Sequence, residues 1–344
     1  MAHNIDMSNG RANIAFIGSR RDIWHRLGTE MKPGQSIETW AKAAGLDWSA
    51  VKVPAIVHLK GAEFDHIDAS KRFAPVDGWN HIVRSDNGAP LGYVSDQYQP
   101  VQPSDVLAWF DRYISVDPRF QLDVAGSLKG GQIIWATATF REKVEVAGSD
   151  HVARVLMSTT FDGSGATTNR GTMTRVVCNN TLDVANADNR AVIRTRHNTP
   201  FNAAKVGKDL AAVAKGFHYF AACGNAMEMV EMSGEDISRF FKAVLDIPFD
   251  TDKKDISTRK LNQFDALREA YGATVQEGTK KNTVWTALNA ITRYVDHDRA
   301  TRNTEATADH SRFASAQFGS GQDMKAKAWN LLLPTIKDKV PVAA

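Results

Sequence analysis

The sequence predicts an α+β protein in which an antiparallel β-sheet lies between helices and a helical region forms the C-terminal third. Four stretches between residues 120 and 182 alternate along the chain with the period of two that β-strands require. From residue 203 onward, apolar residues recur at the spacing of amphipathic helices. A hydrophobic share of 43% and sixteen phenylalanines suit a soluble globular chain with a sizeable core.

The N-terminal hundred residues predict a helix and a hairpin. Ser36 is a suitable N-cap residue, and Gly45 ends the helix that follows it. Short strands are expected next, at residues 51–59, 79–85 and 90–96. The last two flank Asn87-Gly88, a strong signal for a hairpin turn.

The middle of the chain predicts the sheet. A helix at residues 104–114 has an apolar stripe and ends before Asp117-Pro118. Four strands follow, at residues 120–128, 131–140, 151–161 and 172–182. Both faces of these strands carry some apolar residues, so we expect helices to cover one face and to leave the other partly open.

Amphipathic segments fill the rest of the chain. Helices are expected at residues 205–232, 235–245, 259–272, 282–298 and 324–334. We therefore divide the chain into an N-terminal α+β region (1–102), a sheet with a long helix (103–247) and a helical C-terminal region (248–344).

Positive charge is concentrated in the second half of the predicted sheet. Between His151 and Lys215 there are nine Lys and Arg and four Asp and Glu, a net charge of +5 (nine minus four), whereas the whole chain carries +3. A localised basic face is typical of proteins that bind polyanions. A basic sheet face that is merely solvated would give the same count.

If the face binds a polynucleotide, its arginines are the expected phosphate contacts. The candidates in the strands and their connections are Arg154, Arg175, Arg190, Arg194 and Arg196. Lys129 and Arg170 are placed in loops that could clamp a strand. Trp135 or Phe161 could stack on a base, although core packing is the simpler interpretation for Trp135.

Sequence motifs for enzyme chemistry are absent. Gly163-Ser164-Gly165 begins like a dinucleotide-binding loop, but Thr168 replaces the third glycine, and no GK[ST] sequence follows a glycine loop. The chain also contains no HExxH, CxxC or GxSxG sequence. We therefore expect no cofactor.

One acid–histidine group leaves a metal-dependent alternative open. Asp296 and His297 lie close in sequence to Asp309 and His310, and such residues can bind a divalent cation. On a helix, however, adjacent side chains point to different faces and do not easily converge on one ion.

Several segments together resemble a family of phage- and plasmid-encoded proteins, domain-of-unknown-function family 932. The matching segments are WHRLGT (24–29), YVSDQYQPVQ (93–102), RVVCNNTL (175–182), NTVWTALNAITRYVDH (282–297) and AWNLLL (328–333). More weakly, residues 103–232 resemble in architecture the core of phage single-strand annealing recombinases of the Red-beta, Erf and Sak groups.

Charge and resemblance together suggest a non-enzymatic protein that binds and anneals single-stranded DNA in phage or plasmid recombination. The resemblance implies a homo-oligomeric ring or filament. Two cysteines, no secretory signal and no long apolar run predict a cytoplasmic protein of the bacterial host cell, without a membrane partner. The alternatives are a metal-dependent nucleic-acid hydrolase and a host-interaction or virion-associated protein.

Overall fold

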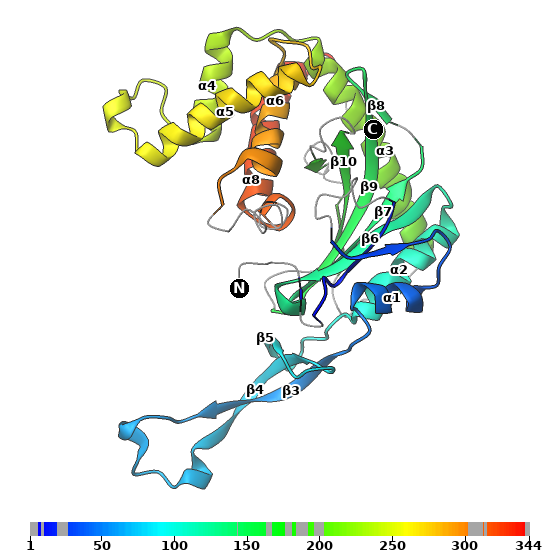
Figure 1. Cartoon of the computed structure of the whole chain (residues 1–344), viewed down its shortest axis with the longest axis vertical. Coiled ribbons are helices and arrows are strands. Elements are labelled where there is room, and N and C mark those ends of the chain that lie inside the picture. Colours follow the sequence, from blue (N-terminus) through cyan, green and yellow to red (C-terminus); the bar gives the residue numbers. More distant parts are fainter. Residues whose placement is uncertain are drawn as a thin grey trace.

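A computed structural model describes residues 6–7, 10–18, 27–142, 144–162, 167–175, 181–183, 192–195, 203–301, 312 and 315–340. It is elongated, with a β-ribbon projecting at one end of a central sheet and helices curving away at the other (Figure 1). The α+β class, the helices before and after the sheet and the helical C-terminal third are all confirmed.

The central sheet has nine described strands. These are β1 (Ile14–Ile17), β2 (Thr29–Met31), β6 (Phe120–Leu128), β7 (Ile133–Phe140), β8 (Val144–Val146), β9 (Ser149–Thr160), β10 (Thr167–Arg175), β11 (Thr181–Asp183) and β12 (Val192–Thr195). Their order is β11-β10-β9-β7-β6-β1-β2, with β12 added to β10 and β8 to β9. All pairs are antiparallel except β1 with β2. Because β1 pairs with β6, residues before 102 take part in this sheet.

Three helices pack against the sheet: α1 (Ile37–Ala44), α2 (Pro103–Val116) and α3 (Ala203–Glu228). The Ser36 hydroxyl accepts from the backbone N–H of Thr39, and Gly45 ends α1 with a φ of 62°, as predicted. Phe110 of α2 and Phe217 of α3 belong to the same core cluster as Ala136 and Val155 of the sheet. One sheet face is thus covered by helices.

The C-terminal region is built from α4 (Gly234–Val244), α5 (Thr258–Gln276), α6 (Val284–Arg293) and α8 (Ser320–Leu332). Ser233 and Asp236 form the predicted capping box at the start of α4. Helix α6 is buried along its length and continues into a π-helical turn, Tyr294–Asp298. Within the described residues, no helix combines the length and apolar composition that crossing a bilayer requires.

A second, antiparallel sheet forms the projecting ribbon, with β4 (Phe73–Arg84) between β3 (Ala50–His58) and β5 (Pro90–Ser95). The predicted Asn87-Gly88 turn joins β4 to β5. Gly88 has a φ of 71°, and the Asn87 side chain accepts from the backbone N–H of Ala89 at 2.9 Å. The three short strands that the sequence predicts therefore form a separate ribbon.

Candidate nucleic-acid interface

The face of the central sheet opposite α1, α2 and α3 carries two of the predicted arginines. Arg170 is registered opposite Leu156, and Arg154 is registered opposite Thr172, two positions along β10 from Arg170. Because residues two apart on a strand share a face, Arg154 and Arg170 lie on the same face of the sheet.

Arg154 is already engaged with an acidic neighbour. Its Nε donates to Oδ2 of Asp123 at 2.6 Å, and the two side chains are 28% and 16% exposed. Asp123 lies at a register shift in β6, and β7 separates β6 from β9, the strand that carries Arg154. Arg154 is therefore only partly available to a phosphate.

Arg170 is not a loop residue, because it lies within β10 and is buried. Its guanidinium donates to the backbone carbonyl of Gln317 and lies 5.4 Å from the ring centroid of Phe318. The C-terminal segment around Gln317 thus covers this part of the face.

The two predicted stacking residues are buried as well. Trp135 is 1% exposed and belongs to a small apolar cluster with Leu156, against which Phe318 packs. Phe161 is fully buried, with its ring centroid 5.8 Å from that of Trp48. Stacking on a base needs a ring face open to solvent, so neither buried ring can stack in this arrangement. For Trp135 the simpler interpretation, core packing, is the one observed.

The other predicted contacts are only partly described. Lys129 is exposed in the turn between β6 and β7. Arg175 and Arg194 lie in β10 and β12, with backbones registered opposite His151 and Thr168. Arg190 and Arg196 fall outside the described residues. Convergence of these arginines on one surface remains a prediction.

The metal alternative receives no support from its described members. Asp296 Oδ1 accepts from Lys325 Nζ at 2.9 Å, and both side chains are over nine-tenths buried. A cation would have to displace this ammonium group. Asp309 and His310 lie outside the described residues, and no group of three potential ligands occurs within them.

The ribbon carries an aromatic surface that sequence reasoning missed. Trp79 and Tyr93 are each 44% exposed, and their rings stack with centroids 4.7 Å apart and planes 6° from parallel. His81 lies opposite Tyr93 in the register, with ring centroids 5.2 Å apart. We call these three residues the aromatic face.

Strand alternation explains why these rings face solvent. Asn80 and Ile82, the intervening residues of β4, are buried on the opposite side. Of the eleven large apolar side chains that the described residues expose, six belong to the ribbon. The ribbon is thus the main exposed apolar surface of the described protein, and such surfaces commonly bind partners.

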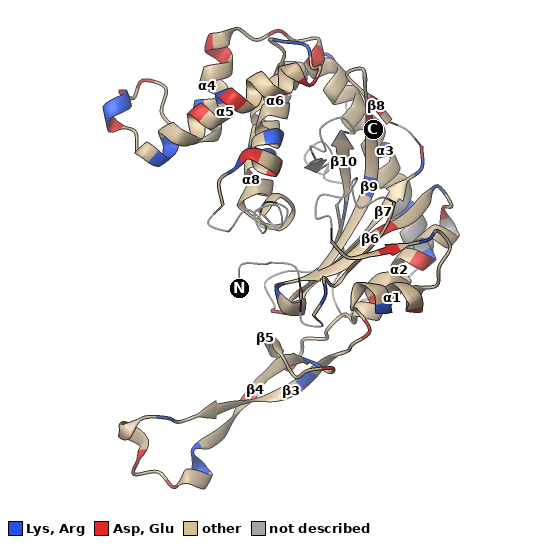
Figure 2. Ribbon diagram, in the orientation of Figure 1, with Lys and Arg blue, Asp and Glu red and all other residues tan. Residues whose placement is uncertain are grey.

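The ribbon itself is not basic. Residues 50–96 contain five Lys and Arg and six Asp and Glu, a net charge of −1 (five minus six). Its strands are mostly uncharged, and charged residues of both signs lie at its tip (Figure 2). Any phosphate contacts must therefore come mainly from the rest of the chain.

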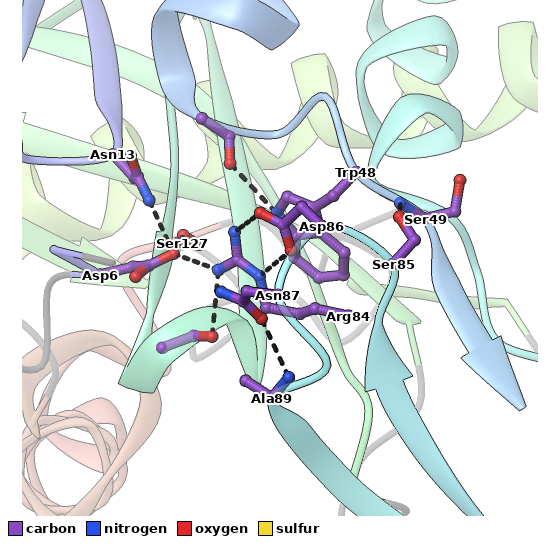
Figure 3. Close-up of polar contacts among 12 residues, drawn as sticks. Asp6, Asn13, Trp48, Ser49, Arg84, Ser85, Asp86, Asn87, Ala89 and Ser127 are labelled. Carbon is purple, nitrogen blue, oxygen red and sulfur yellow. Dashed lines mark hydrogen bonds and ion pairs between the residues drawn. The ribbon is translucent and has the colours of Figure 1, made fainter. Parts of the chain in front are cut away.

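A buried ionic joint fixes the ribbon to the central sheet (Figure 3). Arg84 Nη1 donates to Asp6 Oδ2 at 2.6 Å, and its Nε and Nη2 donate to the two carboxylate oxygens of Asp86. Asp6 also accepts from Asn13 and Ser127. The Asp6 carboxylate thus connects the N-terminal segment to Arg84 of β4 and to Ser127 of β6.

Electrostatic interactions favour the ionised forms of Arg84 and Asp86. Burial alone would lower the pKa of Arg84, but hydrogen bonds to Asp86 and Asp6 outweigh it and raise that pKa. Hydrogen bonds from Arg84 in turn hold the pKa of Asp86 below its usual value. The Arg84 guanidinium also lies 4.5 Å from the ring centroid of Trp48.

Two further contacts hold the base of the ribbon. Lys52 Nζ donates to the carbonyls of Asp96 and Tyr98, and the Tyr98 hydroxyl donates to the carbonyl of Thr160 in β9 at 2.8 Å. Burial raises the pKa of Tyr98 to about 12. With the ionic joint, these contacts hold the ribbon base on the sheet.

A signal for the aromatic face was present in the sequence. Trp79 and His81 alternate in a predicted strand, and Tyr93 lies beyond a predicted hairpin turn that places it opposite His81. The alternation of side chains does not say which face of a strand the rest of the protein covers. The sequence therefore could not show that Trp79, His81 and Tyr93 lie on the open face.

Comparisons with known proteins identify a family for this chain and no individual relative. No curated protein and no solved structure matches the chain. A family model described as a domain of unknown function, DUF932, matches residues 90–317, which include Tyr93 but begin after Trp79 and His81. Since this match spans well over half of the chain, the protein belongs to the DUF932 family.

Proposed function

We propose that the protein binds single-stranded nucleic acid and that the aromatic face of the ribbon stacks on unpaired bases. The observation that carries the proposal is the exposed, nearly parallel pair Trp79 and Tyr93, 4.7 Å apart on a projecting sheet. Stacking on exposed aromatic side chains contributes about 1–3 kcal/mol per base and tolerates any sequence.

The arrangement favours a single strand over a duplex. In a duplex the faces of each base are covered by its neighbours in the stack, whereas unpaired bases can turn outward onto a protein ring. A ribbon that projects from the body can present its rings without a deep groove. Lys129, exposed in a turn whose Gly130 carbonyl accepts from Arg84, supplies a cation at the base of the ribbon.

Annealing in phage or plasmid recombination is the more specific form of this proposal. Annealing requires a bound strand and no nucleotide hydrolysis, and the sequence contains no motif for hydrolysis. The excess of five positive charges between His151 and Lys215 would supply phosphate contacts from the sheet side. We further propose that the protein acts as a homo-oligomer in the cytoplasm of a bacterial host.

The first test measures oligonucleotide binding by Trp79→Ala and Tyr93→Ala variants. Fluorescence anisotropy of a labelled oligothymidine strand should show a Kd increased by about 5-fold to 150-fold, which corresponds to about 1–3 kcal/mol. The slope of affinity against salt should not change, because neither side chain is charged.

Phe249→Ala is the matched control. Phe249 is 46% exposed, similar to Trp79, but lies between α4 and α5 and away from the ribbon. Its loss should leave the Kd unchanged. Equal affinity of the native protein, Trp79→Ala and Tyr93→Ala for the strand would refute the proposed site. Tighter binding of the same strand after annealing to its complement would refute the preference for unpaired bases.

A further inference from the structure

The outer half of the ribbon differs from the half that carries the aromatic face. Strand β5 pairs with β4 only between Trp79 and Val83, so beyond that point β3 and β4 continue as two strands. Their pairs here are Ile56 with Pro75, Val57 with Ala74 and His58 with Phe73. We call residues 56–75 the distal arm, which projects from the body in Figure 1.

Apolar side chains are exposed on both faces of the distal arm. Ile56 and Phe73 are each 57% exposed, and the Phe73 ring stacks on that of His58 with centroids 4.1 Å apart. Val57, 44% exposed, alternates with Ile56 and His58 and lies on the opposite face. No other described element of the chain covers these residues.

A partner is physically favoured at this position. An isolated two-stranded ribbon is only marginally stable in water and normally needs a third strand or another layer. Large apolar groups gain free energy when they leave water. Among the described residues, the distal arm has neither a third strand nor a layer from its own chain.

Charge indicates what kind of partner fits. The connection at residues 59–72 carries three basic and three acidic residues, a net charge of zero, and the paired positions at 56–58 and 73–75 carry none. A neutral apolar surface has no attraction for a polyanion. Two identical neutral arms can approach each other without net repulsion, as an isologous contact requires.

The backbone favours contact through the faces of the arm over extension of its edges. Pro54 and Pro75 lie in the two strands, and a proline lacks the N–H group that an added strand would need. We propose that the distal arm docks through its apolar side chains onto a second copy of this chain. The inference does not depend on nucleic-acid binding.

Sedimentation equilibrium of the full chain tests the proposal. The native protein should self-associate, and an Ile56→Ser/Phe73→Ser double variant should associate at least 10-fold more weakly. Phe249→Ser, which removes another exposed ring at a distance from the ribbon, should behave as the native protein. A monomeric native protein at tens of micromolar, or full self-association of the double variant, would overturn the proposal.

Two further measurements separate this proposal from others. Far-UV circular dichroism should show the double variant folded, since both substituted side chains are exposed. Anisotropy with the oligothymidine strand should still show binding by single protomers through the intact aromatic face. Loss of strand binding with retained self-association would refute the present proposal and leave a role of the arm in binding nucleic acid.

Discussion

A nucleic-acid-binding surface needs open aromatic rings and positive charge, and these lie in different regions of the molecule, the ribbon and the central sheet. The ribbon exposes stacked rings but has almost no net charge. On the sheet, the two predicted arginines whose side chains the structure describes, Arg154 and Arg170, are paired or covered. A count of charges along the chain pointed to the sheet, yet the stacked pair of exposed rings, Trp79 and Tyr93, lies on the ribbon. A surplus of arginine therefore does not identify an accessible site until the neighbours of each guanidinium are known.

The largest expected effect concerns the joint that connects these two regions. Replacing Arg84 by Met should lower the free energy of unfolding by about 3–5 kcal/mol, because Asp6 would keep a buried charge without its cation. Asp6 is 1% exposed and Arg84 is 1% exposed, so water cannot readily replace the missing guanidinium. Urea unfolding followed by circular dichroism measures the change.

Two controls sharpen the test of the joint. A double variant, Asp6→Asn with Arg84→Met, should lose less than the sum of the single losses, because no fully buried charge then lacks a partner. Asp86 also loses its cation, but its side chain is 32% exposed and water can hydrate it. Asp86 has a lowered pKa, so its stabilising contribution is present above the ordinary Asp pKa of about 3.9 and is lost as the pH falls through the folded-state pKa. In Asp86→Asn, the free energy of unfolding should therefore fall less steeply as the pH is lowered through this range.

An intermediate effect is expected from the predicted phosphate contacts on the sheet side. Replacing Arg194 and Arg196 by Ala should weaken binding of single-stranded DNA and reduce the salt slope by about 0.7 for each phosphate that an arginine no longer neutralises. Trp79→Ala should instead reduce affinity without changing the slope. Anisotropy titrations at four salt concentrations distinguish the two kinds of interaction.

An unchanged slope in the Arg194→Ala/Arg196→Ala variant would remove these two arginines from the proposed interface. Lys60→Ala/Lys71→Ala offers a comparison within the ribbon, since it removes two cations from the tip. That variant should leave both affinity and slope near the native values, because neither lysine is among the proposed phosphate contacts.

Elements with local signals were predictable from the sequence. Ser36 and Gly45 cap the two ends of α1, and Asn87-Gly88 joins β4 to β5. Both kinds of signal depend on residues only a few positions apart in the sequence. The pairings of β1 with β2 and with β6 carried no such signal, and the pairing with β6 brings the N-terminal region into the central sheet.

The candidate site was less predictable, because its decisive contacts join distant residues. Arg170 meets Gln317 across 147 positions of the chain, and Arg84 meets Asp6 across 78. The sequence placed Arg154 in a strand but Arg170 in a loop, whereas Arg170 lies in β10 on the same sheet face as Arg154. Nor could the sequence show that Asp123 pairs with Arg154 and that the C-terminal segment covers Arg170. The open rings of Trp79 and Tyr93 likewise depend on which faces of the ribbon the rest of the chain leaves uncovered.

The smallest expected effect comes from releasing Arg154. Asp123→Asn removes the carboxylate 2.6 Å from Arg154 Nε, and a partly exposed ion pair of this kind contributes about 0.5–1 kcal/mol to stability. If the sheet contacts phosphates, the freed guanidinium should tighten strand binding a few-fold and steepen the salt slope by about 0.7. Asp117→Asn is the matched control, because it removes a comparable carboxylate, 2.7 Å from Arg119 at the turn before β6, and leaves Arg119 with Glu142. Tighter binding in Asp123→Asn alone would show that the sheet arginines and the ribbon contact the same DNA strand. Equal affinity in both variants and the native protein would show that Arg154 makes no phosphate contact.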